Sequence, residues 1–281
     1  MNHISPCAKI NLGLNVTEKR SDGYHNIETV FLPVPIYDAI EIHTMSNDFP
    51  VTTACSLKVT GTQELCDEQK NLVVKAYNLL AKDHALPRIF VHLHKGIPSQ
   101  AGMGGGSSDA AFMIRLLNER FSLGLSVNEM REYAARLGAD CAFFITADAN
   151  TPQPLYATGI GDILEPFNEE WNMLKGKWMV LVKPNVAVST KEAYEGITPT
   201  KPRINCRDAV MQPIETWRDN LINDFEQSIF QKLPVLKDMK QRLYDNGAIY
   251  AAMSGSGSTI FGIFDEKPNM SFSDWNTIVK F

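Results

Sequence analysis

The chain has 281 residues, of which 44% are hydrophobic and 21% are charged, a composition typical of a globular protein with room for two domains of ordinary size. Its net charge of -5 excludes the broad basic surface of most nucleic-acid-binding proteins, so we expect no nucleic-acid partner. Apolar runs such as "WMVLV" and "CAFFI" are too short to span a bilayer, and five cysteines without a C-x-x-C pair fit neither a disulfide framework nor a zinc site. We therefore expect a cytoplasmic protein with reduced thiols and no membrane partner.

The first third of the chain predicts β-strands. Four segments rich in β-branched residues are separated by Asp-Gly, Pro and Ser-Asn turns: 8–16, 24–32, 38–44 and 52–60. Because side chains alternate along a strand, Lys9 and Asn11 share one face of the first segment.

Helical spacing of apolar residues begins at 71–85, and a short strand is predicted over 88–94. A second helical pattern runs over 110–121. Between this strand and this helix lies the glycine-rich stretch "PSQAGMGGGSS", residues 98–108. We call this stretch the phosphate loop, because glycines directly before a helix N-terminus are typical of phosphate sites.

Ser126 and Glu129 form a capping box before a helix over 130–138. The turn-rich sequence "ANTPQP" follows, and we place a domain boundary there, which gives domains 1–150 and 151–281. The second domain is predicted to contain a strand over 178–184, a helix opened by Ser189 and Glu192, a helix over 234–246, and strands over 248–253 and 260–264 joined by "SGSGST".

The phosphate loop has the chemistry of an anion site. Its glycines allow several backbone N–H groups to converge, and the helix that follows adds the positive end of its dipole. No Lys follows the glycines as in G-x-x-x-x-G-K-[ST], and Ser107 breaks the G-x-G-x-x-G spacing, so neither the P-loop nor the Rossmann pattern applies. A tight connection without a ligand is the alternative, but the serines at the helix start add hydroxyl groups and favour phosphate.

Three motifs resemble those of the GHMP kinases, a superfamily of small-molecule kinases. They are "SPCAKINLGLNV" near the N-terminus, "PSQAGMGGGSSDAA" at 98–111 and "MSGSGSTIF" at 253–261, in the family's order. The resemblance extends over residues 5–262 and implies an α+β, two-domain GHMP kinase fold. In that fold the ATP-binding N-terminal domain resembles the second domain of ribosomal protein S5, and the C-terminal domain is ferredoxin-like.

Further motifs resemble one branch of this superfamily. "DGYH" at 22–25, "GADCAFFI" at 138–145 and "NDFE" at 223–226 are similar to the kinases that phosphorylate the 2-hydroxyl of a cytidine-diphosphate-linked methylerythritol, in the non-mevalonate route to isoprenoid precursors. The resemblance implies ATP as phosphoryl donor, Mg²⁺ as its counter-ion, and a monomer or homodimer. The alternatives are a GHMP kinase of the homoserine or mevalonate type and a non-catalytic nucleotide-binding regulator.

The resemblance assigns the catalytic residues as Lys9 and Asp140. Asp140 would accept the proton of the reacting hydroxyl, and Lys9 would contact that hydroxyl and keep the carboxylate ionised. By position alone, Asp140 is an ordinary helix N-cap and Lys9 a solvent-facing strand residue. Ser108 is a further candidate, as a ligand of the Mg²⁺ ion.

The same resemblance implies two binding sets. The ATP-binding set is Lys95, Pro98, Ser99, Gln100, Ala101, Gly102, Met103, Gly104, Gly105, Gly106, Ser107 and Ser108. Lys95 has the alternative of a solvated strand end, and Gln100 stands where family members carry Gly or another small residue. The substrate-binding set is Asn11, Tyr24, His25 and Tyr194, with the cytosine held by the Tyr-His pair and covered by Tyr194. A water-facing strand edge is the alternative for Tyr24 and His25, and helix packing for Tyr194.

Overall fold

The computed structural model describes residues 2–46, 48, 50, 52–62, 67–167 and 171–281. By their contacts these residues divide into two compact units, and each unit is assembled from separate stretches of the chain. The first unit is Met1–Ala8, Pro35–Ser99 and Gly104–Pro152, and the second is Lys9–Val34, Gln100–Met103 and Gln153–Phe281. The sequence-continuous domains 1–150 and 151–281 follow chain order rather than contacts, and they stay a prediction.

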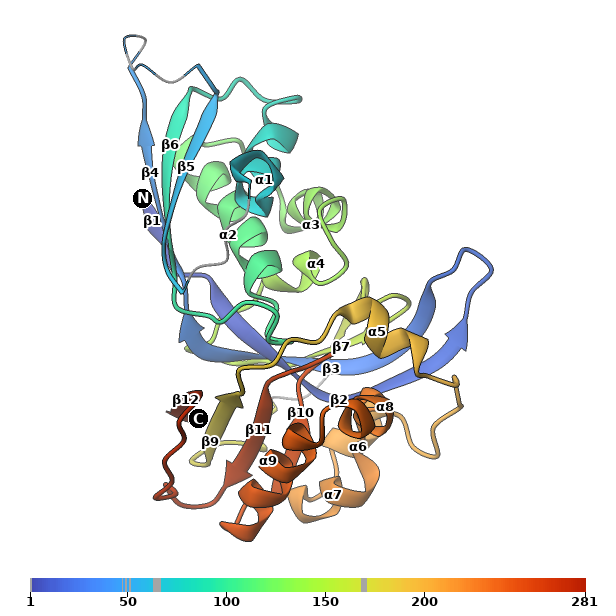
Figure 1. Ribbon diagram of the computed structural model, residues 1–281. Helices are drawn as coiled ribbons and strands as arrows, with labels where there is room; N and C mark the ends of the chain where they lie inside the picture. The colour runs from blue at the N-terminus through green and yellow to red at the C-terminus, as the bar shows by residue number, and fades with distance from the viewer. Residues whose placement is uncertain (1, 47, 49, 51, 63–66, 168–170) are drawn as a thin grey trace. The chain divides into compact units, whose positions relative to one another are not determined.

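The first unit is a four-stranded sheet with helices on one side (Figure 1). The strand order is β1 (His3–Ile4), β4 (Ala39–Thr44), β6 (Ile89–Lys95) and β5 (Cys55–Gly61), with only the β5–β6 pair parallel. The helices are η1 (Glu68–Lys70), α1 (Leu72–Leu80), α2 (Gly105–Arg120), α3 (Val127–Ala135) and α4 (Cys141–Phe144). Along the chain, β6 is followed by the phosphate loop and then by α2.

Alternation along β4 and β6 explains why only one side of this sheet is covered. Ile40 and Val91 are fully buried beneath the helices, whereas Glu41 and His94 on the opposite face are exposed. The predicted strand over 88–94 and the capping box of α3 are confirmed. The predicted helix over 71–85 ends earlier, at Leu80, because exposed polar side chains follow and end its apolar face.

The second unit contains two four-stranded sheets. One has the order β2 (Cys7–Lys19), β3 (His25–Tyr37), β7 (Leu155–Thr158) and β8 (Ile163–Pro166). The other is antiparallel, with the order β10 (Tyr250–Met253), β11 (Ile260–Phe264), β9 (Trp178–Lys183) and β12 (Trp275–Lys280). The helical segments are α5 (Thr190–Glu195), α6 (Cys206–Val210), η2 (Ile214–Thr216), α7 (Trp217–Asn220), α8 (Phe225–Lys232) and α9 (Pro234–Asp245).

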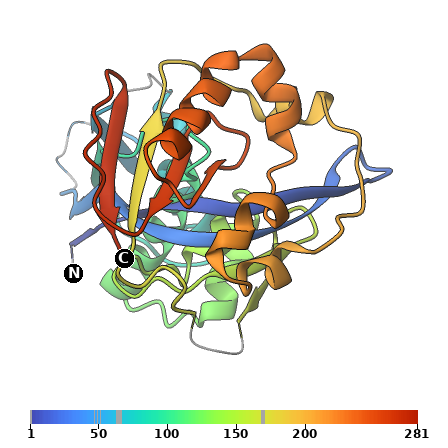
Figure 2. The same ribbon diagram turned by 90° about the horizontal axis from the view of Figure 1, so that it is seen from below.

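Helix α9 lies against the β10-β11-β9-β12 sheet (Figures 1 and 2), and α8 packs on α9 and adds Phe225 and Ile229 to the core. Val180 of β9, Met253 of β10 and Leu243 of α9 meet there without solvent exposure. The capping box of α5 and the helix beginning at Pro234 are confirmed. Within the described ranges, every helix is too short or too polar to cross a membrane.

Candidate functional site

The phosphate loop takes left-handed backbone angles at three positions. The φ angles are 48° at Gln100, 70° at Gly102 and 69° at Gly104. Glycine adopts this conformation at little cost, whereas Gln100, which has a Cβ, is strained by it. The exposed side chain of Gln100 leaves the course of the backbone unobstructed.

Helix α2 begins inside the glycine run, at Gly105. Its N-cap is Gly104, which has no side chain to bond the first-turn N–H groups, so these groups and the helix dipole are available to an anion. A Cβ at Gly105 would lie 3.1 Å from the side chain of Ile97. The backbone therefore passes close to the end of β6, as an anion-binding connection requires.

The middle of the phosphate loop is held by two other motif segments within the second unit. Lys9 N–H donates to the Met103 carbonyl at 3.0 Å, and the Ser254 hydroxyl donates to the Gly102 carbonyl at 2.9 Å. A Cβ at Gly102 would lie 1.9 Å from the carbonyl oxygen of Ser254, so only glycine fits there. The backbone N–H of Asn11 donates to the same Ser254 hydroxyl at 3.3 Å, which connects β2 to residues 254–259, the C-terminal glycine loop. All three superfamily motifs thus meet in one hydrogen-bonded cluster.

Lys9 lies in β2 with only 3% of its surface exposed, so it is not a solvent-facing strand residue. Its ammonium donates to Asn11 Oδ1 at 2.6 Å and lies 5.1 Å from the centre of the Phe31 ring. Asn11 Nδ2 donates in turn to the Thr29 hydroxyl at 2.9 Å. The chain of contacts fixes the position of a buried positive charge.

Asp140 occupies the N-cap position of α4 in the first unit, between Gly138 and the buried run Cys141–Phe144. Its side chain makes no capping hydrogen bond to α4, all of whose residues are described. Capping is therefore not what the carboxylate does. Burial raises the pKa of the neighbouring Cys141 thiol to about 11, so this thiol stays protonated near neutral pH and is a poor nucleophile.

The predicted substrate residues His25 and Tyr194 lie together in the second unit. Their rings stack with centres 4.8 Å apart and an interplanar angle of 17°, and Tyr194 also meets Phe225 edge-on at 4.9 Å. Burial and the nearby charge of Lys19 lower the pKa of His25, which favours a neutral ring with one donor and one acceptor nitrogen. Tyr24 is 62% exposed just before β3.

Lys95 is not a solvated strand end. Its ammonium is bonded to the carboxylates of Asp38 and Asp109, at 2.7 Å from Asp109 Oδ2, and 11% of its side chain is exposed. Burial opposes its charge, but the two carboxylates outweigh burial and raise the pKa of Lys95.

Ser108 is fully buried, and its hydroxyl donates to the Cys7 carbonyl at 2.6 Å. This contact fits a tie between α2 and the start of β2 better than a metal ligand. Among the residues that the structure describes, there is no cluster of three or more His, Cys, Asp or Glu side chains suited to a metal.

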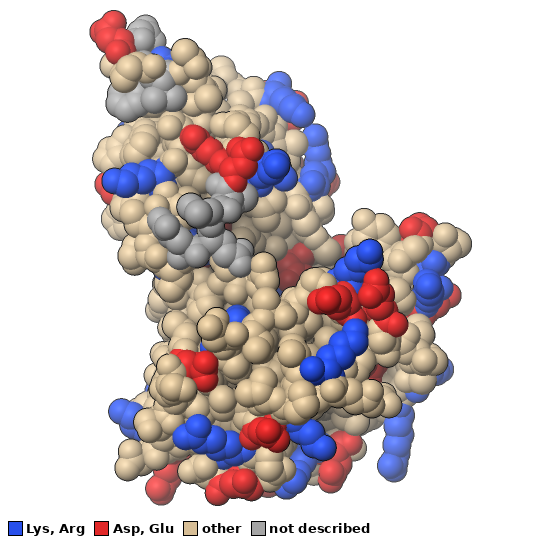
Figure 3. All heavy atoms as spheres, in the orientation of Figure 1, with Lys and Arg blue, Asp and Glu red and all other residues tan. Residues whose placement is uncertain are grey.

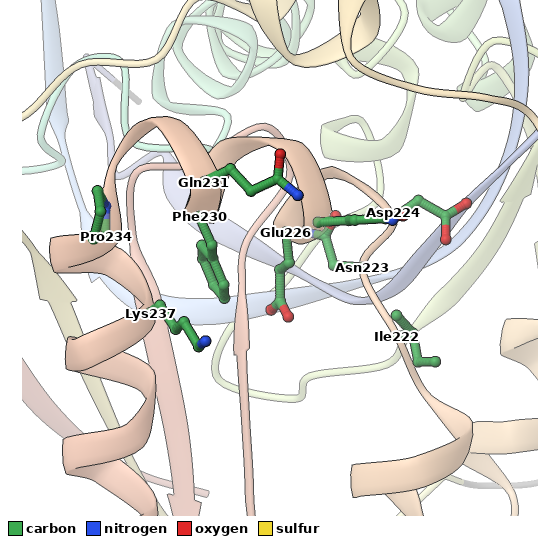
Figure 4. Close-up of a pocket in the computed structure, with 9 residues that line it drawn as sticks. Ile222, Asn223, Asp224, Glu226, Phe230, Gln231, Pro234 and Lys237 are labelled. Carbon is green, nitrogen blue, oxygen red and sulfur yellow. The ribbon is translucent and has the colours of Figure 1, made fainter.

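A pocket of about 620 Å³ lies at the start of α8 in the second unit (Figure 4), away in sequence from every predicted site residue. It is lined by Ile222, Asn223, Asp224, Glu226, Gln227, Phe230, Gln231, Pro234 and Lys237. Three of these, Asn223, Asp224 and Glu226, belong to the "NDFE" motif, and their side chains are hydrogen-bonded to other residues of the second unit. Asn223 Nδ2 donates to the carbonyls of Met253 and Gly255, at 2.7 and 2.8 Å, so the motif holds the C-terminal glycine loop in place.

Sequence reasoning missed several partners of the site residues. Thr29, Phe31 and Ser254 hold Lys9, Asn11 and the phosphate loop, and Asp38 and Asp109 hold Lys95. Ser254 and Asp109 lie inside the motifs at 253–261 and 98–111, so the motifs did contain a signal. Thr29, Phe31 and Asp38 have no local pattern that marks them.

Residues 71–148 match the model of the GHMP kinases N terminal domain, and residues 209–270 match that of the GHMP kinases C terminal. The 4-diphosphocytidyl-2-C-methyl-D-erythritol kinase of Bacteroides fragilis is 49% identical over 273 residues, 96% of this chain and 94% of that protein. The protein of the same name from Bacteroides thetaiotaomicron is 48% identical over 98% of this chain and 96% of its own length. A crystal structure of 4-(cytidine 5'-diphospho)-2C-methyl-D-erythritol kinase aligns with a TM-score of 0.74 and 28% identity, over 92% of this chain and 89% of that one.

Proposed function

This chain belongs to the GHMP kinases, in the group of the 4-diphosphocytidyl-2-C-methyl-D-erythritol kinases, and we infer that it phosphorylates the 2-hydroxyl of that cytidyl compound with ATP. The two-domain GHMP kinase fold expected from the motifs is confirmed. The reaction belongs to the non-mevalonate route to isoprenoid precursors. Homoserine or mevalonate as the acceptor is a poorer match, because the near full-length relatives share the cytidyl kinase name.

In this reaction the 2-hydroxyl oxygen attacks the γ-phosphorus of ATP, and the bond between that phosphorus and the oxygen bridging to the β-phosphate breaks. The products are the 2-phosphate and ADP, and the hydroxyl proton passes to a base. Catalysis then depends on positioning, on neutralising the phosphate charge and on accepting this proton.

The observation that carries the proposal is the backbone of the phosphate loop. Left-handed glycines lead into α2, whose N-cap Gly104 leaves its first-turn N–H groups uncapped by a side chain. The loop is tied at Gly102 and Met103 to the two other superfamily motifs. A rigid row of N–H donors at a helix N-terminus suits the phosphates of ATP.

For the chemical step we propose Asp140 as the base and Lys9 as the cation at the acceptor hydroxyl. A buried ammonium held by Asn11 and the Phe31 ring supports the role of Lys9, since an exposed lysine would have no fixed position. The place of Asp140 in the "GADCAFFI" motif, at the N-terminus of α4 beside the buried residues Cys141–Phe144, supports its role as the base.

For the cytidyl group we propose a site at His25 and Tyr194, with Tyr24 and Asn11. The stacked rings of His25 and Tyr194 offer an aromatic surface, and a neutral His25 offers one donor and one acceptor to cytosine. Asn11 Nδ2 carries two hydrogens, and Thr29 takes one of them. The other is the one that we propose for the substrate.

We propose that Mg²⁺ enters with ATP as part of the MgATP substrate and neutralises phosphate charge. Four described cysteines are unbridged and buried, which supports a reducing, cytoplasmic location. On the face seen in Figure 3, Lys and Arg side chains alternate with Asp and Glu side chains, a mixed surface that supports a small-molecule partner rather than nucleic acid. A monomer or homodimer remains part of the proposal.

The test is transfer of radiolabelled γ-phosphate from MgATP to the cytidyl substrate, with homoserine and mevalonate as competing acceptors. We expect label only in the cytidyl product. Labelled phosphohomoserine or phosphomevalonate with an unlabelled cytidyl substrate would contradict the specificity. Label in none of the three, from a folded protein that binds ATP, would favour a regulator.

A further inference from the structure

Lys95 and Asp109 bracket the phosphate loop. Lys95 is the last residue of β6, and Asp109 lies near the start of α2. The Lys95 ammonium and Asp109 Oδ2 are 2.7 Å apart, so an ion pair closes the base of the connection over residues 96–108. The two ends of the connection are therefore joined side chain to side chain.

Asp38, which lies between β3 and β4, fixes the same end of the connection. Its Oδ2 is bonded to the Lys95 ammonium, and its Oδ1 accepts the backbone N–H groups of Gly96 at 2.7 Å and Ile97 at 2.8 Å. A Cβ at Gly96 would lie 2.5 Å from the Tyr37 carbonyl oxygen, so the two chain segments touch here. One carboxylate thus positions both the lysine and the first two N–H groups of the connection.

This cluster is unlike the ion pairs on the protein surface. The Asp38 side chain is fully buried, and the side chains of Asp109 and Lys95 are 4% and 11% exposed. Asp109 Oδ1 has no hydrogen-bond partner in the described part of the chain, and a buried carboxylate in that state costs folding free energy. Simple stabilisation is therefore a poor explanation for the cluster.

We propose that the Lys95–Asp109 pair is a clamp that sets the width of the phosphate loop, and that Asp38 and Asp109 are positioning residues for ATP. The inference rests on the proposed function, since it assigns ATP to this loop. If the ends of the connection move apart, the N–H groups between them no longer converge on one phosphate. Lys95 acts by holding the base closed rather than by direct contact with the nucleotide.

The experiment measures the dissociation constant of a non-hydrolysable ATP analogue by calorimetry for Asp109→Asn, Lys95→Met and the double variant. We expect each single variant to weaken binding roughly tenfold or more, because misplacement of binding groups by about 1 Å has effects of this size. The double variant should be no weaker than the worse single variant, since both break the same clamp. Unchanged binding in Asp109→Asn, or additive losses in the double variant, would overturn the proposal and leave Lys95 as a direct contact.

Lys177→Met is the matched control, because it removes a lysine from a 2.6 Å ion pair with Asp265, far in sequence from the loop. Its analogue binding should equal that of the wild type. If Asp109→Asn shows no cooperative thermal unfolding transition, Asp38→Asn replaces it, with the same expected loss of analogue binding. In steady-state kinetics the clamp variants should raise KM for ATP and leave KM for the cytidyl substrate unchanged, whereas general loosening would raise both.

Analogue binding requires no acceptor, so this test gives an answer even where the cytidyl compound proves not to be the substrate. A wild-type protein that binds the analogue but phosphorylates a different alcohol would refute the proposed function and leave the clamp standing. If all clamp variants bind the analogue as tightly as the wild type does, the clamp is refuted and the proposed function stands.

Discussion

Replacing Tyr194 with Ala separates the two interpretations of this residue, a cover for cytosine or a packing residue for α5. In the structure its ring stacks on His25 at 4.8 Å and meets Phe225 of α8 edge-on at 4.9 Å. The substitution therefore removes both an aromatic surface at the proposed cytidyl site and a contact between α5 and α8.

The two losses affect different quantities: the lost aromatic surface affects KM for the cytidyl substrate, and the lost packing affects the free energy of unfolding. Stacking of a nucleobase on an aromatic side chain contributes about 1–3 kcal/mol, so KM for the cytidyl substrate should rise roughly 5- to 150-fold. Lost packing should lower the free energy of unfolding by about 0.5–3 kcal/mol. Tyr194→Phe retains the ring, so both quantities should stay near the wild-type values.

Steady-state kinetics with each substrate varied in turn, together with thermal unfolding, measures these effects. KM for ATP serves as the internal control and should not change in Tyr194→Ala. A folded Tyr194→Ala protein with lower stability and an unchanged KM for the cytidyl substrate would refute the reasoning and leave Tyr194 as a packing residue only.

Asp140→Asn should lower kcat by about 10²- to 10⁴-fold in the phosphate-transfer assay with unchanged binding of an ATP analogue, and near-normal turnover would exclude it as the base. Because the pKa of His25 is lowered from 6.5, the ring should stay neutral and cytidine nucleotide binding should stay constant from about pH 8 to about pH 6.5. Below that pH, binding should weaken as the ring gains a proton. His25→Gln should abolish this weakening, and a variant with the same pH profile as the wild type would contradict the role of His25. Gln100→Gly should relieve left-handed strain and raise the free energy of unfolding by up to about 1 kcal/mol with an unchanged KM for ATP, whereas lower stability would show that the exposed side chain contributes contacts.

Local patterns predicted the elements around the phosphate loop well. The structure confirms the strand β6, the helix α2 and the capping boxes of α3 and α5. Each of these features depends on the spacing of residues within a short segment. The start of α2 was predicted too late, because Gly105 and Gly106 are poor helix formers and have no side chains that could add to the apolar spacing.

Elements that depend on distant partners were missed. The strands β7 and β8 have only four residues each, and β7 is recognisable as a strand by its pairing with β3, more than a hundred residues earlier in the chain. Helix α8 was missed because its buried side includes the polar residues Glu226 and Ser228, which weakens the apolar spacing that marks a helix. Short elements of this kind take their conformation from tertiary contacts.

The candidate site shows the same division. The motifs located Lys9, Asn11 and the phosphate loop, and they include Asp109, but Asp38, the other carboxylate at Lys95, lies outside all of them. Asp38 and Lys95 are 57 residues apart, and neither has a local signal that predicts the other. Pairs of this kind follow from topology, which a single sequence pattern does not encode.

The interleaved chain course has a consequence for biosynthesis. Residues 9–34 leave the ribosome well before residues 153–281, which complete the same compact unit. Strands β2 and β3 must therefore wait, with apolar faces unpaired, while the residues of the first unit are synthesised between them. We expect the nascent chain to need protection from aggregation during this interval, and expect a fragment ending at residue 150 to expose the same strands permanently.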